Sequence, residues 1–281
     1  MYVSPRKTSN LWQRIVLPEN ITCCSGLEVH NLTLTLPGLE QPTRLLLFSD
    51  LHWPVQDTAR LQALQDNVQR DPPDWLLFAG DLISFLEYVG PACEWLSTLP
   101  ARCGKIAVLG NRESVTDWHS PTFWTRIYGK CGFQCLINAA LVPPSGPVFY
   151  GLDDCRFGHP QWSGCAAWKD SGRPVVSLAH SPDTFAEAGS QFIGRLCLCG
   201  HTHGGQVRLP FWGPIYTSSL YGRQFVSGWR QRSDGTLCHI SRGVGESGFG
   251  VARRRFRCPP EILRLNLVPE QRKTGCDSDC T

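Results

Sequence analysis

The sequence has no long apolar run and little net charge. No stretch of its 281 residues approaches the 18 or more consecutive apolar residues of a membrane-spanning helix. The first 17 residues also lack the continuous apolar core of a secretory signal peptide. The net charge of +3 is too small to indicate a nucleic-acid-binding protein. We therefore predict a cytoplasmic protein, either free or peripheral on the inner face of the cytoplasmic membrane, with no nucleic-acid or protein partner.

The sequence also lacks CxxC pairs, internal repeats and low-complexity blocks. Its 14 cysteines therefore argue against a structural zinc knuckle. Cys197 and Cys199 alternate along an expected buried strand, where a free cysteine behaves as a small apolar residue. We expect the cysteines to be mostly reduced and structural. A hydrophobic content of 42% and a charged content of 18% are typical of a globular protein, and the length is ample for a full hydrophobic core.

Apolar strands alternate with helices in the first half of the chain, a pattern typical of βαβ units. Strands are expected there at 28–36, 45–48, 75–79 and 105–109, and helices at 56–70 and at 85–99 with an interruption near Gly90-Pro91. The second half is rich in strands and glycine, with strands expected at 148–152, 175–178, 196–199, 237–241 and 262–267.

This pattern divides the chain into three segments. Residues 27–269 are expected to form one domain. Residues 1–26 precede it as a mixed N-terminal segment that can associate with a membrane. Residues 270–281 are polar and are expected to form a flexible tail.

Residues of metal-ligand types directly follow several of these strands, the place where open α/β sheets position their sites. The seven candidates are Asp50, His52, Asp81, Asn111, His180, His201 and His203. Alone, an aspartate at such a place is usually a turn residue and a histidine a core or surface residue, but several motifs in one order argue against that reading. Seven ligands are too many for one tetrahedral ion and suit two ions that share a carboxylate. The sequence therefore predicts a two-metal site that activates water for attack on phosphorus.

In order, these motifs read DxH, GD, GN, H and GHxH, and they resemble the calcineurin-like metallophosphoesterase superfamily. The strings Gly200–Gln206, Gly151–Asp154 and Pro259–Ile262 resemble its bacterial YkuE/YaeI-type branch. The resemblance runs from about Thr43 to Leu267. It implies an α/β (α+β) fold, a four-layer αββα sandwich of two mixed sheets.

The resemblance also implies how the ligands are shared. Asp50, His52, Asp81 and His203 would hold the first metal ion. Asp81, Asn111, His180 and His201 would hold the second, so that Asp81 bridges the two. The ligand set accepts Mn²⁺, Fe²⁺, Co²⁺ or Zn²⁺, and we expect two Mn²⁺ ions.

Arg112 departs from the superfamily pattern, which has a histidine after the asparagine. That histidine is assigned to help the leaving group depart, and arginine cannot donate a proton usefully because its pKa stays above about 12. An alkoxide leaving group, with a pKa on the order of 15, needs a proton, whereas a phosphate does not. Arg112 can still hold a phosphate through its fork of donors. Arg112 and Asn111 are thus the catalytic candidates, and the substitution favours cleavage of a phosphoanhydride; a drifted enzyme with reduced activity is the alternative.

The same Asn-Arg pair occurs in UDP-2,3-diacylglucosamine pyrophosphatases, and the chain resembles their chlamydial type. This resemblance implies hydrolysis of UDP-2,3-diacylglucosamine to UMP and 2,3-diacylglucosamine 1-phosphate in lipid A biosynthesis. One alternative is a general phosphodiesterase or phosphatase of the YkuE/YaeI type. Another is a metal-free scaffold on the same fold, although a scaffold is expected to have lost ligands and all seven are present here.

Aromatic and basic residues follow the last metal motif and suit an anionic lipid at a membrane surface. The aromatic residues extend from Phe211 to Trp229; the arginines are Arg208, Arg223, Arg230, Arg232, Arg253, Arg254, Arg255 and Arg257. We expect Arg208 to contact the substrate. Trp12, with its basic neighbours, is a second candidate for membrane contact. Loops that cap the second sheet, or a nucleic-acid surface, are the alternatives.

Overall fold

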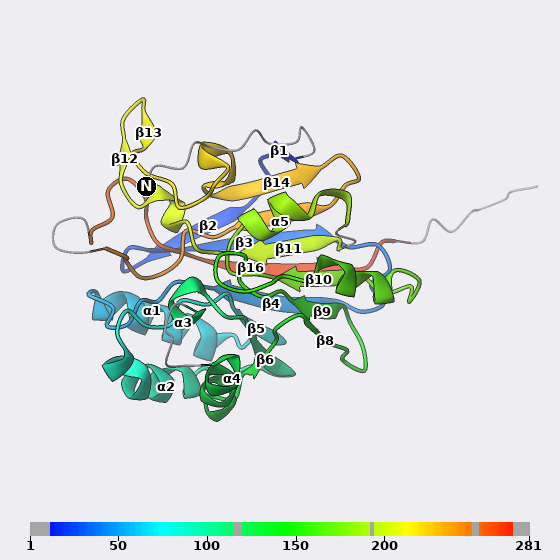
Figure 1. Cartoon of the computed structure of the whole chain (residues 1–281), viewed down its shortest axis with the longest axis horizontal. Coiled ribbons are helices and arrows are strands. Elements are labelled where there is room, and N and C mark those ends of the chain that lie inside the picture. Colours follow the sequence, from blue (N-terminus) through cyan, green and yellow to red (C-terminus); the bar gives the residue numbers. More distant parts are fainter. Residues whose placement is uncertain (1–11, 115–119, 192–193, 249–252, 272–281) are drawn as a thin grey trace, which may run out of the picture.

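Two seven-stranded sheets lie face to face at the centre of the molecule (Figure 1). The computed structural model describes residues 12–114, 120–191, 194–248 and 253–271. Sheet A contains, in spatial order, β1 (Trp12–Arg14), β14 (Gly228–Arg232), β15 (Leu237–Ile240), β11 (Leu196–Cys199), β10 (Val175–Leu178), β9 (Val148–Gly151) and β8 (Ala139–Leu141). Sheet B contains β2 (Asn20–Cys24), β3 (Leu27–Thr35), β16 (Glu261–Val268), β4 (Thr43–Phe48), β5 (Trp75–Phe78), β6 (Gly104–Ala107) and β7 (Gln134–Cys135).

Both sheets are mixed, as predicted. In sheet B, β4, β5, β6 and β7 are parallel to one another, whereas β16 runs antiparallel to β4. In sheet A, β9, β10, β11 and β15 are parallel, and β14 and β1 extend the sheet antiparallel. The carboxyl ends of four parallel strands in each sheet therefore meet at one edge of that sheet.

Helices cover the outer face of each sheet and complete the predicted αββα order (Figure 1). On sheet B lie α1 (Thr58–Arg70), α2 (Val89–Ser97) and α4 (Pro121–Lys130). On sheet A lie α5 (Asp183–Ala188) and the 3₁₀ helix η2 (Trp162–Trp168). The shorter elements are η1 (Leu86–Tyr88), α3 (Asn111–Ser114), η3 (Gly189–Gln191), η4 (His203–Gly205), η5 (Gly222–Phe225) and the hairpin strands β12 (Arg208–Leu209) and β13 (Gly213–Pro214).

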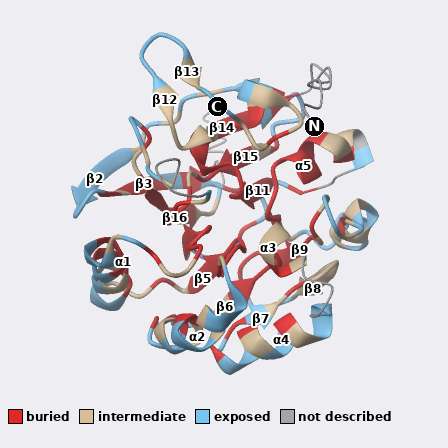
Figure 2. Ribbon diagram, turned by 60° about the vertical axis from the view of Figure 1, so that its left-hand side comes forward, coloured by how far each residue is buried: buried red, intermediate tan, exposed pale blue. Residues whose placement is uncertain are grey.

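Apolar side chains that alternate between the two faces of each strand form the hydrophobic layers between these elements. In β4, Leu46 and Phe48 face the helices, while Leu45 and Leu47 face sheet A. Because successive side chains of a strand point to opposite faces, a continuous apolar run fills both layers at once. Figure 2 shows the buried residues concentrated in the sheets and the exposed ones on the outer faces of the helices.

Helix boundaries follow local signals. The side chain of Asp57 caps α1 by accepting hydrogen bonds from two backbone amides of its first turn, and the helix ends before Pro72. The helix expected over 85–99 is divided into η1 and α2, and Gly90-Pro91 lies in the first turn of α2 rather than at the break. The sequence analysis missed α4, although Ser120 caps it and Pro121 occupies its first position.

The N-terminal segment joins both sheets where it is described. β1 pairs with β14, and β2 pairs with β3. Trp12 is buried, contacts the ring of Phe225 edge to face and lies beneath the guanidinium of Arg232. The prediction that Trp12 contacts a membrane is therefore wrong, because its side chain is packed in the protein core. Residues 1–11 and most of the predicted tail lie outside the described residues.

Candidate metal centre

All seven predicted ligand residues come together where parallel strands of the two sheets end. Sheet B supplies Asp50 and His52 after β4, Asp81 after β5 and Asn111 after β6; sheet A supplies His180 after β10 and His201 and His203 after β11. The cluster therefore spans the seam between the sheets. Residues up to 153 positions apart in the sequence form one site because both sets of strands end on the same side.

One group of ligand atoms gathers around Asp50. The Nε2 atoms of His52 and His203 face each other at 2.9 Å, and Oδ1 of Asp50 lies 3.6 Å from Nε2 of His203. Asp50 is held in place by the Ser49 hydroxyl, which donates to Oδ2 at 2.6 Å, and by the His201 backbone amide. All these ligand side chains are buried.

A second group of ligand atoms gathers around His180. Nδ1 of His201 and Oδ1 of Asn111 each lie 3.0 Å from Nε2 of His180. On the other side of its ring, Nδ1 of His180 donates to the backbone carbonyl of Ala79 at 2.7 Å. This hydrogen bond orients the ring so that Nε2 points into the cluster.

Asp81 lies between the two groups. Its Oδ2 atom is 3.3 Å from Nε2 of His52, and its Oδ1 atom is 3.5 Å from Nε2 of His180. One carboxylate oxygen thus faces each group, which is the arrangement that a bridging ligand requires.

The residues present fit divalent metal ions. Imidazole nitrogens and carboxylate oxygens converge within 4.8 Å of one another in two overlapping sets, Asp50 with His52 and His203, and Asp50 with Asp81 and His180. Two imidazole lone pairs that face each other at hydrogen-bonding distance can share one proton or bind one cation. A mixed oxygen and nitrogen donor set of this kind accepts Mn²⁺, Fe²⁺ or Zn²⁺ and does not identify one of them.

The electrostatics of the cluster favour a cation. Burial lowers the pKa of His52 to about 4, and burial with the charge of His180 lowers that of His201 to about 3. Burial also opposes charge on His180, but Asp81 and Asp50 outweigh this effect and raise its pKa to about 10. Burial likewise raises the pKa of Asp81, yet His180 keeps it well below its usual range. The carboxylates therefore stabilise positive charge inside the cluster.

Five of the seven ligand residues adopt a left-handed backbone conformation. Their φ angles are 54° at Asp50, 47° at His52, 58° at Asp81, 71° at His201 and 49° at His203. Aspartate and histidine tolerate this region better than most residues do, but it still costs about 1–3 kcal/mol each. Such strain, repeated at the loops that carry the ligands, is typical of a functional site whose surroundings hold it in place.

Glycines let these loops approach one another closely. Gly80, Gly110 and Gly200 directly precede candidate ligands, and of the three only Gly80 has a positive φ, +83°. At Gly110 a Cβ atom would collide with the carboxylate of Asp81, and at Gly200 with that of Asp50. These two glycines are therefore required by contact with a ligand rather than by a turn.

Glu113 supports the loop of Asp81, a role that the sequence analysis missed. Its buried carboxylate accepts hydrogen bonds from the backbone amides of Asp81 (2.9 Å), Leu82 (2.7 Å) and Gly110 (2.7 Å). Burial, followed by the negative charge of Asp81, raises the pKa of Glu113 to about 7. Glu113 lies two positions after Asn111 in the metal motif, but spacing alone could not show that its carboxylate turns back onto the preceding strand ends.

Arg255 supports the other side of the cluster. Its guanidinium donates to the backbone carbonyls of Arg242 (2.7 Å) and Gly245 (2.6 Å), and it reaches the carbonyl of His203 at 3.3 Å. Arg253 donates to the carbonyl of His52 at 2.9 Å. The predicted basic surface at 253–257 is thus partly wrong, because alternate arginines point inward and join loops around the ligands.

Arg112 and Arg208 differ in their surroundings. The backbone amide of Arg112 donates to Oδ1 of Asp81 at 2.8 Å, while no acceptor for its guanidinium is present among the described residues. The guanidinium of Arg208 donates to the carbonyl of Gly204 (2.7 Å) and the hydroxyl of Ser227 (2.6 Å). The roles of Arg112 and Arg208 toward a substrate both stay predictions.

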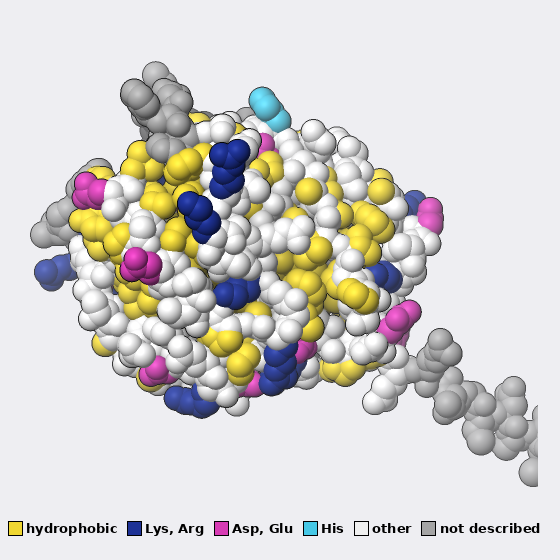
Figure 3. Space-filling model, turned by 90° about the horizontal axis from the view of Figure 1, so that it is seen from below, with side chains coloured by type: hydrophobic (Ala, Val, Ile, Leu, Met, Phe, Trp, Pro, Cys, Tyr) yellow, Lys and Arg dark blue, Asp and Glu magenta, His cyan; other side chains and the backbone are white. Residues whose placement is uncertain are grey.

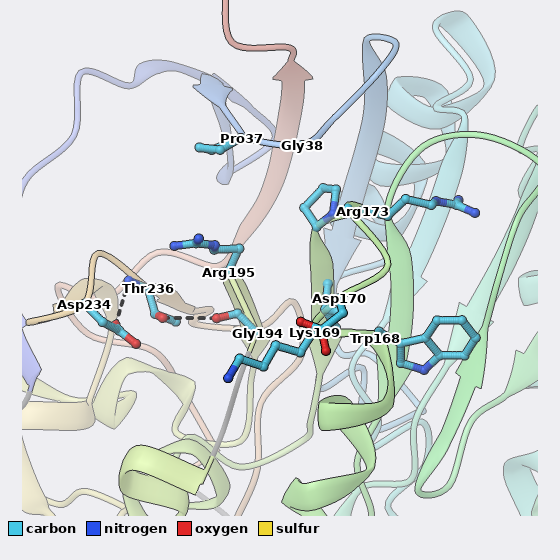
Figure 4. A pocket seen from close by; sticks show the side chains of 13 residues that line it. Pro37, Gly38, Trp168, Lys169, Asp170, Arg173, Gly194, Arg195, Asp234 and Thr236 are labelled. Carbon is cyan, nitrogen blue, oxygen red and sulfur yellow. Dashed lines mark hydrogen bonds between the residues drawn. The ribbon is translucent and has the colours of Figure 1, made fainter.

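A cavity of about 490 Å³ lies at the opposite end of the sheet A strands (Figure 4). It borders the amino ends of β10, β11 and β15, at Val175, Arg195 and Thr236. The hydroxyl of Thr236 donates to the carbonyl of Gly194 at 3.0 Å, and its backbone amide donates to Asp234. No predicted site residue lines this cavity.

Two stacked mixed sheets, with a cluster of Asp, His and Asn side chains at their strand ends, form a candidate dinuclear metal centre. The chain belongs to the calcineurin-like phosphoesterase family, whose profile matches residues 43–205. It is therefore a metal-dependent hydrolase that acts on phosphoester bonds.

Several bacterial proteins are similar over most of the chain. The uncharacterized metallophosphoesterase YkuE of Bacillus subtilis is 28% identical, over 80% of this chain and 78% of its own length. Phosphodiesterase YaeI of Escherichia coli is 27% identical, over 81% and 83%. UDP-2,3-diacylglucosamine pyrophosphatase LpxG of Chlamydia trachomatis is 24% identical, over 81% and 84%.

Solved structures align with the chain at low TM-score and low sequence identity. The phosphopantetheinyl hydrolase PptH of Mycobacterium tuberculosis aligns with a TM-score of 0.41 and 12% identity, over 71% of this chain and 88% of that one. A purple acid phosphatase from yellow lupin aligns with a TM-score of 0.36 and 13% identity, over 86% and 56%.

Proposed function

We propose that the protein hydrolyses the pyrophosphate bond of UDP-2,3-diacylglucosamine to UMP and 2,3-diacylglucosamine 1-phosphate, a step of lipid A biosynthesis. The observation that carries this proposal is the position of Arg112, directly after the candidate ligand Asn111 and joined through its backbone amide to Asp81, with no acceptor for its guanidinium among the described residues. The similarity to LpxG over 81% of the chain supports it.

The seven candidate ligands would hold two metal ions. Asp50, His52, Asp81 and His203 would hold one metal ion, and Asp81 with Asn111, His180 and His201 would hold the other. Two such ions supply an activated water and neutralise charge on the phosphoryl oxygens.

Arg112 adds a fixed fork of donors for the phosphoryl group next to this cluster. Arg156, an exposed residue whose charge contributes to the low pKa of His201, is a second cation beside the site. Water adds across the P–O–P bond, so that each of the two products carries a phosphate group at the point of cleavage. Because a phosphate leaving group needs no proton, an arginine can replace an acid at position 112.

The proposal includes where the enzyme works and which ion it uses. A doubly acylated substrate is held in a bilayer, so we place the enzyme on the inner face of the cytoplasmic membrane, with Mn²⁺ as its metal. None of the described helices is long and apolar enough to cross a bilayer. Membrane contact would therefore be made from the surface by the described part of the chain.

A general phosphodiesterase of the YkuE/YaeI type is the second candidate function. The identities to YkuE and YaeI, 28% and 27%, exceed the 24% to LpxG. The two candidates differ in the bond that is broken. A diester with an alkoxide leaving group benefits from an acid at position 112, and a pyrophosphate does not.

One experiment separates these functions. The purified protein with Mn²⁺ is incubated with UDP-2,3-diacylglucosamine, with a bis-aryl phosphate and with single-stranded DNA, and the products are resolved. We expect UMP and the lipid phosphate in preference to the other products. Cleavage of the aryl diester with the UDP-lipid left intact would establish the YkuE/YaeI-type alternative. A protein that binds no stoichiometric metal and cleaves none of the three would be a scaffold.

A further inference from the structure

We propose that the β12–β13 hairpin, residues 208–216, inserts its tip into the interface of an anionic phospholipid bilayer. The hairpin projects from the edge of the molecule, away from both sheets (Figure 1). Its large apolar side chains are exposed: Leu209, Phe211, Trp212, Ile215 and Tyr216. Phe211 is fully exposed and Trp212 is 72% exposed, so the tip contributes little to the described core.

The structure restricts the predicted aromatic surface to this hairpin. Phe225 and Trp229, which were expected to belong to it, are buried. Phe256 is exposed and pairs with Val207 at the base of the hairpin through a β-bridge. Aromatic side chains gathered on one projecting loop are suited to the headgroup region of a membrane, where their apolar rings leave water.

The segment of the sequence that contains the hairpin has charges of one sign. From His201 to Ser233 the sequence contains no aspartate or glutamate. Arg223 is exposed, and one of its guanidinium nitrogens lies 3.5 Å from the carbonyl of Pro214. Arg254 and Arg257 are exposed on either side of Phe256. By contrast, the face formed by the helices on sheet B carries basic and acidic side chains intermingled (Figure 3). An apolar tip within a basic surround is complementary to an anionic lipid surface.

The hairpin packs against a loop of the candidate metal centre. A Cβ atom at Gly205 would collide with Pro214, so the hairpin packs directly on the loop that carries His203. The backbone amide of Ile215 donates to the carbonyl of Val207 at 3.1 Å. Docking the hairpin would therefore hold the metal centre at the membrane surface.

The inference rests on the proposed function only for the reason why the protein would bind a membrane. A lipid-linked substrate would explain why the metal centre is held at a bilayer surface. The binding itself is measured without catalysis. The full-length protein is sedimented with phosphatidylcholine vesicles, with and without phosphatidylglycerol, at low and high salt. The parent should bind the anionic vesicles, and less at high salt.

Matched variants test the hairpin. The double variant Phe211→Ser/Trp212→Ser should bind anionic vesicles roughly tenfold or more weakly than the parent. The control Phe85→Ser/Leu86→Ser removes two exposed apolar side chains from another part of the surface and should bind like the parent. Arg223→Gln should weaken binding to anionic vesicles only.

Equal binding by the parent and the hairpin variant would overturn the inference. A parent that binds no vesicles but dimerises in sedimentation velocity, with the dimer lost in the hairpin variant, would assign the hairpin to self-association instead. Hydrolysis of a soluble bis-aryl phosphate should be the same in the parent and the hairpin variant. Vesicle binding through the hairpin without cleavage of the UDP-lipid would leave the inference standing and refute the proposed function.

Discussion

The two ends of the parallel strands differ in a way that identifies the site. The carboxyl ends hold a compact cluster in which Asp50 and His180 are fully buried and polar atoms face one another. The amino ends of sheet A border a cavity of about 490 Å³ in which Arg195 and Asp234 are exposed to solvent. Exposed charges need no partner, whereas buried ones do. The convergence of buried donor atoms, and not the size of a hollow, therefore marks the functional end.

Removal of the bridging carboxylate should have the largest effect at the carboxyl end. Asp81→Ala should lose both metal ions and all measurable turnover, because Asp81 faces both ligand groups and offsets the repulsion between two cations. Asp50→Ala should lose mainly the ion held with His52 and His203. Metal content measured on both purified variants tests this order. Near-full occupancy in Asp81→Ala would remove Asp81 from the bridging role.

Replacement of Arg112 should impair turnover without emptying the site. Arg112→Ala should keep its metal content and cut turnover of the UDP-lipid by roughly 10²–10³, the scale of losing one transition-state donor. Arg112→Lys should restore turnover only in part, because an ammonium cannot reproduce the fork of donors. Arg112→His should slow pyrophosphate cleavage and spare or raise the hydrolysis of esters with poor leaving groups. If Arg112→Ala cleaved the UDP-lipid as fast as the parent, Arg112 would have no catalytic role.

Arg255 is expected to position His203, so its replacement should weaken metal binding. Arg255→Lys keeps a positive charge but cannot reach several carbonyls at once, so we expect about 10–100-fold weaker binding of one of the two ions. Titration of the metal-stripped protein with Mn²⁺ measures this change. Arg254→Lys, at the exposed neighbouring position, is the control and should titrate like the parent. Unchanged affinity at both Mn²⁺ sites in Arg255→Lys would leave Arg255 with a purely structural role.

Strand cores and the candidate ligands could be located from the sequence because both are local signals. Apolar runs such as 45–48 and 75–79 end directly at Asp50 and Gly80, and the chain keeps that order in the fold. The support of the ligands could not be predicted in the same way. Arg255 and Trp12 occupy segments that look basic or amphipathic in the sequence, yet both side chains pack inward. Their burial depends on which loops meet across the sheets, and the local sequence does not contain that information.

A substitution at the amino ends of the sheet A strands should change the stability of the protein and leave its turnover unchanged. The hydrogen bond from Arg232, opposed by partial burial, lowers the pKa of Asp234 below its usual range. A lowered pKa contributes stability above the unfolded-state value of about 3.9. This contribution is lost as the pH falls below that value and through the folded-state pKa. Asp234→Asn should therefore slightly lower the free energy of unfolding at neutral pH.

The difference between Asp234→Asn and the parent should shrink below about pH 4, where the carboxylate of the parent also takes up protons. It should be small at every pH, since half of the Asp234 side chain is exposed and its ion pair is screened by water. Urea unfolding at several pH values measures it. Asp170→Asn is the control, because Asp170 lines the same cavity and has no ion-pair partner among the described residues. Metal content and turnover should match the parent in both variants. A loss of turnover in Asp234→Asn would show that the two ends of the strands are coupled.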